Sequence, residues 1–403
     1  MSELALILVL IGLGIPFYSY VGYPVFLFAA AACVQVTRDV RFLLYRGDRR
    51  RRSNSRPSVS IVMSAYNEEA VIQQTLDACR NVDYPDERLE VVVGLDGCTD
   101  DTAELARQYE DSGVRVLDFD KRRGKISVIN DCVQRASGDI LVFTDANTRI
   151  EPGAVRKLIR HFDNPRIGAV CGELRLERSE SGENREGFYW RYEVALKTLE
   201  SRLNGVLGAN GSLYALRKEL FPDVDADIVT DDFIIPMKVK QQGYEVTYDP
   251  EAVAREETAR SVRDEYRRRV RIGAGNWQAL SHCASLLFPW KGFASVSFWS
   301  HKVFRWFTPF LLLTALVANF FVLDGTAGQA LLAAQALFYG AAGLGYVLQK
   351  HELPAGPLRL PAYFVTINIA LAVGLLRGAA GLQEAAWGRT ARAAVAGGEK
   401  QPE

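Results

Sequence analysis

Long uncharged stretches lie near both ends of the chain, whereas charged residues are spread through its middle. The uncharged stretches cover residues 4–33, 306–323, 325–349 and 360–376. A helix of about 20 apolar residues crosses the hydrocarbon core of a bilayer. The pattern therefore predicts one transmembrane helix near the N-terminus and about three near the C-terminus.

Short β-branched runs alternate with helical patterns from residue 58 onward. The first run ends in YNEE, and the next expected strands cover residues 89–97, 114–119 and 139–147, with helices expected at 70–80 and 125–136. This alternation predicts an α/β fold with a mostly parallel sheet and helices on both faces. Ligands of such sheets bind beyond the carboxyl ends of the strands, where the polar segments YNEE, DGCTDD and DAN stand.

The pattern changes after the fourth expected strand. A long helix is expected at 183–203, a Gly-rich segment follows, and a basic helix is expected at 260–281. We divide the chain into an N-terminal transmembrane helix at 1–35, a basic juxtamembrane linker at 36–57, a cytosolic domain at 58–281, an amphipathic interfacial segment at 282–302, transmembrane helices at 303–383 and a tail at 384–403.

The charges place the middle domain relative to the membrane. Eight arginines and two aspartates lie between residues 38 and 56, and basic flanks of membrane helices favour the cytoplasmic side. We therefore expect a multi-pass protein of a bacterial-type plasma membrane with its middle domain in the cytoplasm. The side of the C-terminus stays open, because Arg377, Arg389 and Arg392 favour the inside whereas four spans place it outside.

Composition excludes several function classes. The chain has 48 Lys plus Arg and 48 Asp plus Glu, and this zero net charge argues against a general nucleic-acid binder. The six cysteines form no CxxC pair and the four histidines have no metal-ligand spacing, so neither a zinc site nor a disulfide framework is predicted.

Carboxylates follow the apolar runs at four positions. Asp96, Asp145, Asp231 and Asp232 could each hold a ribose, a base or a divalent cation, or each could be a turn or helix N-cap residue. Lys125 follows a glycine and could reach a diphosphate as a point charge, or it could be a surface lysine. The ordered series AYNEE, LDGCTDD, GK, TDAN and TDD is more specific than any one of its members.

That series resembles the inverting glycosyltransferases of family 2, which have the GT-A fold. The resemblance runs from about residue 58 to 280, and the flanking spans resemble those of the cellulose synthase, chitin synthase and Nod-factor synthase branch. It implies a GT-A, Rossmann-like domain that binds a nucleotide-diphosphate sugar, and we expect this donor to be a UDP-sugar. The implied donor-binding residues are Ala65, Tyr66, Glu68, Asp96, Lys125, Asp145 and Arg271.

The resemblance also implies a metal and a general base. Asp145 and Asn147 stand at the family's DxD position and would hold Mg²⁺ or Mn²⁺, although Asn147 replaces the second carboxylate. Asp232 ends the family's TED-like motif and would take the proton of the acceptor hydroxyl, with Asp231 in support. Attack opposite the leaving diphosphate would invert the anomeric carbon and give a β-glycoside.

The acceptor side of the resemblance is less complete. Asn210 and Gly211 lie in a Gly-rich loop where backbone could approach a sugar, and Trp277 could either stack on a sugar or anchor at the membrane interface. The QxxRW motif of processive synthases is altered, since Arg268 replaces Gln and Ile272 replaces Trp.

Several functions therefore stay open. The leading hypothesis is a membrane-bound sugar transferase that acts on a glycan or a lipid-linked acceptor. The alternatives are a processive synthase that also extrudes its polymer, a polyprenyl-phosphate sugar transferase, and a non-catalytic nucleotide-binding membrane scaffold. Sequence decides neither the donor sugar, the acceptor, the linkage position nor the oligomeric state.

Overall fold

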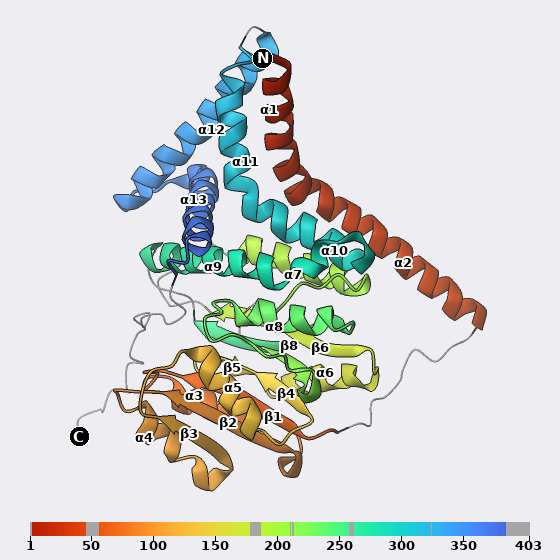
Figure 1. Ribbon diagram of the computed structural model, residues 1–403, viewed down its shortest axis with the longest axis vertical. Coiled ribbons are helices and arrows are strands. Elements are labelled where there is room, and N and C mark those ends of the chain that lie inside the picture. The colour runs from red at the N-terminus through yellow and green to blue at the C-terminus, as the bar shows by residue number, and fades with distance from the viewer. Residues whose placement is uncertain are drawn as a thin grey trace, which may run out of the picture. The chain divides into compact units, whose positions relative to one another are not determined.

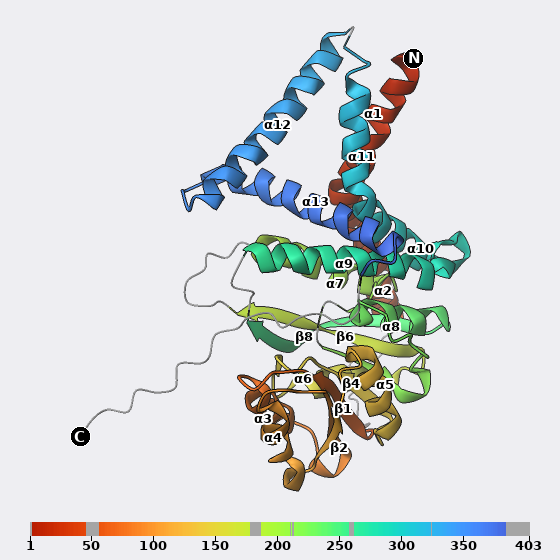
Figure 2. The ribbon, with the colours of Figure 1, turned by 60° about the vertical axis from the view of Figure 1, so that its left-hand side comes forward.

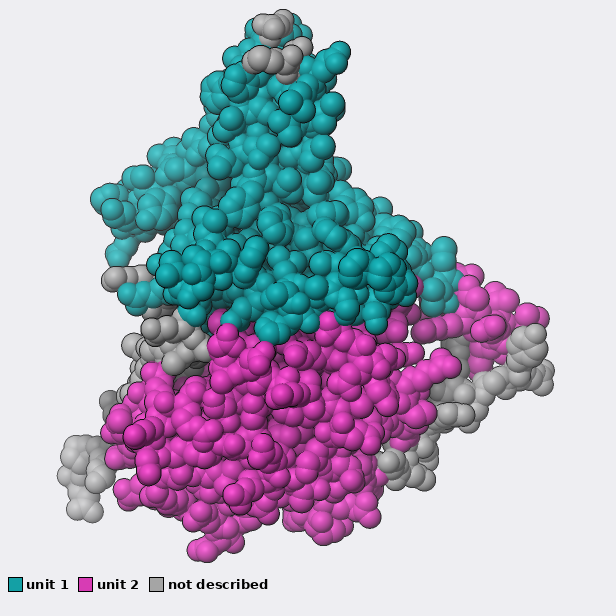
Figure 3. Space-filling model, viewed as in Figure 1, with its two compact units in different colours: residues 1–34, 262–383 teal, residues 35–261, 384–403 magenta. Residues whose placement is uncertain are grey.

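The protein forms two compact units, which Figure 3 colours separately. The computed structural model describes residues 2–45, 56–177, 187–209, 211, 213–257, 262–323 and 325–383. Unit 1 contains residues 1–34 and 262–383, and unit 2 contains residues 35–261 and 384–403.

Unit 2 is built on a mixed, mostly parallel sheet (Figure 1). Its strands are β1 Val59–Ala65, β2 Leu89–Asp96, β3 Val114–Phe119, β4 Ile140–Phe143, β5 Arg149–Ile150, β6 Ile167–Glu177, β7 Tyr214–Arg217 and β8 Glu245–Glu257. They lie in the order β3-β2-β1-β4-β7-β6-β8-β5, with β1 to β4 parallel and β7 antiparallel to both of its neighbours. The predicted α/β fold is thereby confirmed.

Helices cover both faces of this sheet. They are α3 Ile72–Arg80, α4 Thr102–Arg107, α5 Lys125–Arg135, α6 Ala154–Ile159, α7 Gly187–Arg202 and α8 Asp231–Gln241. Side chains of β1 and β2 are almost all buried, because parallel strands of this kind are covered on both sides. Gly94 lets α5 approach β2 closely, since a Cβ there would lie 2.2 Å from Val128 Cγ1.

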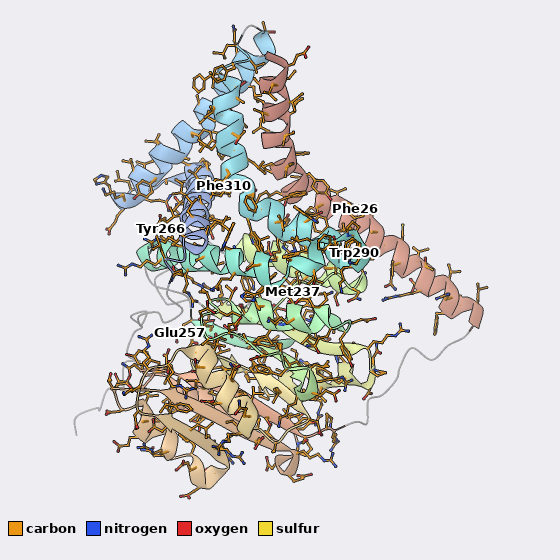
Figure 4. The ribbon with its side chains drawn as sticks, in the orientation of Figure 1. Phe26, Met237, Glu257, Tyr266, Trp290 and Phe310 are labelled. Atoms are coloured by element: carbon orange, nitrogen blue, oxygen red, sulfur yellow. The ribbon has the colours of Figure 1, made fainter. Side chains whose placement is uncertain are left out.

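The second half of the sheet carries the helices that follow the long strand β6. α7 packs on β8, and α8 packs on β6 and β8. Met237, labelled in Figure 4, is fully buried on α8. This packing fixes the start of α8, where the Asp231–Asp232 pair stands.

Unit 1 is entirely helical in its described residues. Its helices are α1 Ser2–Phe17, α2 Tyr23–Tyr45 (which continues into unit 2), α9 Val262–His282, α10 Phe293–Ser297, α11 Phe304–Asn319, α12 Thr326–Lys350 and α13 Arg359–Ala379. α1 lies beside α11 (Figure 1), and α9 lies beside α13 (Figure 2). Buried hydroxyls tie the N-terminal helix to the C-terminal part, because Ser19 Oγ donates to the Ser300 carbonyl at 2.6 Å and Tyr23 donates to Ser297 Oγ at 3.0 Å.

Within the described residues, three helical segments are long and apolar enough to cross a membrane. They are Glu3–Leu44, Thr326–Lys350 and Gly356–Ala379. The expected span within 303–323 forms α11, which has 16 residues and is not one of the three. Its crossing of the membrane, and the interfacial role of residues 282–302, stay predictions.

One boundary differs from the division expected from sequence. We placed the basic helix at 260–281 in the transferase domain, whereas α9 groups with the membrane helices of unit 1. The reason is close packing on α13: a Cβ at Gly273 would lie 2.9 Å from the Leu371 carbonyl oxygen.

Candidate functional site

An ammonium group joins two carboxylates at the ends of the central strands. Lys125 Nζ lies 2.8 Å from Asp145 Oδ1 and 2.9 Å from Asp231 Oδ2. Asp145 follows β4, Lys125 begins α5 and Asp231 begins α8. Three motifs far apart in the sequence therefore meet in one place, at the edge of the sheet where ligands of such folds bind.

The general-base candidate belongs to the same group. Asp232 Oδ2 accepts a hydrogen bond from the Gly211 backbone N–H at 2.8 Å, and the Asp232 carbonyl accepts one from Ala209 at 2.8 Å. Both aspartates stand in the first turn of α8, where the helix dipole favours negative charge. The two aspartates thus stand at the start of a helix, as the alternative helix-end interpretation expects. They also lie near Lys125 and Asp145.

These charges alter one another's proton affinity. Burial and the neighbouring Asp231 raise the pKa of Asp232 above its ordinary value, against the opposing effects of the Gly211 N–H and Lys125. Burial alone would lower the pKa of Lys125, but Asp145 and Asp231 outweigh it and raise that pKa. The lysine is therefore charged at neutral pH, and Asp232 is a stronger base than a solvent-exposed aspartate.

The expected nucleotide side lies at the ends of β1 and β2. Ala65 ends β1 and is buried, and the ring of Tyr66 lies under the Arg122 guanidinium, 4.0 Å from its carbon. The Glu68 backbone N–H donates to Thr102 Oγ1 at 2.7 Å, which fixes this turn against α4.

Asp96 has a structural task in this region. It is only 3% exposed, and its carboxylate accepts backbone N–H groups from Arg123 at 2.6 Å and Gly124 at 3.0 Å. These bonds hold the loop that carries Arg122 and leads into Lys125. Its expected contact with the nucleotide stays a prediction.

Asp145 and the side-chain oxygen of Asn147 fit a divalent cation that is shared with a substrate. Asp145 supplies one negative charge, and Lys125 beside it supplies one positive charge. Among the described residues, no group of three or more His, Cys, Asp or Glu is assembled to hold a metal. Mg²⁺ commonly takes only one or two protein carboxylates and completes its shell with phosphate oxygens, so the donor set suits a metal that arrives with a diphosphate. Asn147 donates its amide to Glu256 Oε1 at 2.9 Å.

The expected acceptor residues, and the donor residue Arg271, belong to different units of the chain. Gly211 contacts Asp232 directly, whereas Asn210 lies outside the described residues. Arg271 and Trp277 lie on α9 in unit 1, where a Cβ at Gly378 of α13 would lie 2.9 Å from Trp277 Cβ. The roles of these two residues in donor or acceptor binding stay predictions.

Sequence reasoning missed three residues beside this site. Arg122 covers Tyr66, Tyr214 is buried next to the carboxylates, and Lys197 is buried beneath the Gly-rich loop. Only Arg122 had a local signal, the basic run before GK. Nothing in the helical pattern of residues 183–203 distinguishes Lys197 from a surface lysine.

Part of the chain matches a known protein family. Residues 60–224 match the model of the family described as Glycosyl transferase family 2. That segment contains β1 to β7 with Tyr66, Asp96, Lys125 and Asp145. Residues 60–224 thus resemble a family 2 glycosyltransferase, and they lie in the α/β sheet domain of unit 2.

Its curated relatives include bacterial polysaccharide synthases. The chain is 27% identical over 229 residues to a poly-beta-1,6-N-acetyl-D-glucosamine synthase of Staphylococcus epidermidis, covering 55% of each chain. It is 25% identical over 277 residues to the enzyme of that name from Staphylococcus aureus strain COL, covering 64% of this chain and 65% of the other. The chain thus spans between about half and two thirds of the length of these relatives.

A solved structure shares the fold over more of the chain. The mannosyltransferase PcManGT from Pyrobaculum calidifontis, in complex with GDP-Man and Mn²⁺, matches with a TM-score of 0.63 at 22% identity. The match covers 89% of this chain and 99% of that one. A GT-A transferase of similar fold therefore binds a nucleotide sugar together with a divalent cation.

Proposed function

We propose that this protein is a membrane-bound inverting glycosyltransferase that adds N-acetylglucosamine from UDP-N-acetylglucosamine to a growing glycan. The observation that carries the proposal is the convergence of Lys125, Asp145, Asp231 and Asp232 within unit 2. The names of the staphylococcal relatives support the donor sugar and a glycan acceptor. The three candidate spans and the arginine-rich segment after the first support a bacterial plasma membrane with unit 2 on the cytoplasmic side.

In the proposed reaction, Asp232 removes the proton from the acceptor hydroxyl. The acceptor oxygen then bonds to the anomeric carbon while the bond between that carbon and the diphosphate oxygen breaks. The electron pair of the broken bond leaves with the nucleoside diphosphate, and an α-linked donor gives a β-glycoside. The raised pKa of Asp232 favours this role, because a carboxylate that binds its proton more tightly is a better general base.

Lys125 and the nucleotide-side residues bind and orient the donor in this proposal. The Lys125 ammonium is fixed beside Asp145 and can donate to a diphosphate oxygen. Tyr66 and Arg122 offer an aromatic face and a planar cation to a nucleobase. Asp145, with the Asn147 carbonyl oxygen, would hold Mg²⁺ or Mn²⁺, which when bound offsets the charge that develops on the leaving diphosphate.

The test is nucleotide release by the purified full chain in detergent or lipid, measured with a panel of nucleotide sugars. We expect turnover with UDP-N-acetylglucosamine and a loss of about 10²- to 10⁴-fold in Asp232→Asn, the range found for removal of a general base. Asp163→Asn, which changes an exposed aspartate after α6, is the matched control.

Two results would contradict the proposal. Turnover of Asp232→Asn within tenfold of the wild type would exclude Asp232 as the base. Donor binding without turnover for every nucleotide sugar would instead favour the non-catalytic scaffold.

A further inference from the structure

The loop before β7 supplies a hydrogen bond to the catalytic aspartate. The backbone N–H groups of Ala209 and Gly211 donate to the carbonyl and to Oδ2 of Asp232, both at 2.8 Å. The loop is thus attached to Asp232 by two bonds, and one of them ends on the carboxylate itself.

A buried lysine holds this loop from its other side. Lys197 lies on α7, is 1% exposed, and donates from Nζ to the Gly208 carbonyl at 3.1 Å. Its ammonium also lies 5.8 Å from the centre of the Tyr248 ring. Burying an ammonium is costly unless its protons are hydrogen-bonded. The Gly208 carbonyl is one partner of the buried Lys197 ammonium.

Gly208 packs closely against Phe233 in the first turn of α8. Its φ is +67°, which favours glycine, and a Cβ there would lie 2.7 Å from Phe233 Cδ2 and 2.9 Å from Phe233 Cα. Gly208 therefore lies between the Lys197 ammonium and the first turn of α8, the turn that contains Asp232.

We propose that Lys197 is a positioning residue for the general base: by holding the Gly208 carbonyl, it keeps the Gly211 N–H on Asp232 Oδ2. This inference rests on the proposed role of Asp232. A hydrogen bond to the ionised carboxylate favours the charged form. Lys197 thereby extends the range of pH over which Asp232 is ready to accept a proton.

Other titratable groups also act on Asp232. In the described part of the chain they are Asp231 on α8, Lys125 on α5, Asp145 after β4, Tyr214 on β7 and Cys171 on β6. The contact of Lys197 with the loop that bears Gly211 is its bond to the Gly208 carbonyl, so Gly208→Ala, which leaves the Lys197 charge in place, separates the effect of the loop from that of the charge.

The experiment measures kcat, the donor KM and the pH profile of Lys197→Met in the full chain. Without the Gly208 bond the loop relaxes and Asp232 loses the Gly211 N–H. We expect kcat to fall about 10- to 100-fold, the donor KM to change less than threefold, and the acid limb of the kcat profile to move up by about one pH unit. Lys238→Met is the matched control, because Lys238 Nζ also donates to a backbone carbonyl, that of Asp223, away from the site.

A second variant tests the same loop with the lysine intact. Gly208→Ala forces the loop away from Phe233, so we expect it to move the acid limb in the same direction and to be less than additive with Lys197→Met. Gly208→Ala also tests the inference if Lys197→Met does not fold. If the acid limb of the kcat profile is unchanged in folded Lys197→Met or in Gly208→Ala, the inference about Lys197 is wrong. The proposed role of Asp232 is tested separately, because it depends on the loss of activity in Asp232→Asn.

Discussion

At the scale of single residues, one lysine has two carboxylate partners on different elements. Lys125 bonds Asp145 and Asp231 at 2.8 and 2.9 Å. Without it, Asp145, Asp231 and Asp232 would repel one another at close range, and one of them would take up a proton more readily.

Lys125→Met should therefore impair donor binding more than folding. The variant removes the cation expected to contact the diphosphate, and a hydrogen bond to a charged group is worth a factor of about 10 to 150 in binding. We expect the donor KM to rise by roughly that factor, measured by nucleotide release. Lys157→Met is the control, because Lys157 donates to the Glu251 carbonyl instead, and equal KM values in the two variants would exclude a role of Lys125 in donor binding.

Site residues that lie in recognisable sequence motifs can be predicted from the sequence. The resemblance of the ordered motifs singles out Lys125, Asp145, Asp231 and Asp232, and the structure brings them together. Of these four residues, only Asp145 follows a strand, whereas the other three stand at the starts of α5 and α8. Lys197 could not be found in this way, because its partner is a backbone carbonyl. Every residue has a backbone carbonyl, so the sequence does not indicate which carbonyl a lysine will bond.

At the scale of elements, glycines decide how closely helices pack in unit 1. A Cβ at Gly374 of α13 would lie 2.2 Å from the Val270 carbonyl oxygen of α9. Small residues allow close backbone approach between membrane helices, where packing replaces the hydrophobic effect as the driving force.

Gly374→Leu should therefore separate α9 from α13 and destabilise the protein. We expect a loss of about 1–3 kcal/mol, the usual cost of overpacking, seen as a lower Tm in detergent. Gly340→Leu on α12 is the matched control, because a Cβ at Gly340 meets nothing within 4 Å. Equal melting of the two variants would contradict this account.

Local sequence patterns predict the bounds of strands better than they predict the order of strands in the sheet. β2 and β3 are predicted to within one residue, because their apolar runs are continuous. The insertion of β7 between β4 and β6 is not predicted, since strand order depends on pairing between distant segments. α9 groups with the membrane helices of unit 1, where it packs on α13 through small residues that a charge pattern does not reveal.

At the scale of the whole molecule, a unit built on a mixed sheet and a helical unit share one chain (Figure 3). This explains why the chain has a mean hydropathy of −0.02 and yet carries three candidate spans. The relatives that share part of its length are synthases of a polymer.

The number of sugars added should reflect that relationship. We expect full-length protein in lipid vesicles to convert labelled UDP-N-acetylglucosamine into a ladder of products longer than one sugar, resolved by gel or mass spectrometry. Asp232→Asn is the negative control. A single labelled sugar on a lipid carrier would favour the polyprenyl-phosphate transferase instead.

The contact of Lys125 with two carboxylates also describes the enzyme between turnovers. The chain provides its own counterion, so the acidic cluster keeps its geometry while it waits for a donor. Under the proposed function, donor binding would be an exchange of ionic partners, in which the diphosphate shares the ammonium with Asp145 and Asp231. The departure of the nucleotide would then restore the two original ion pairs.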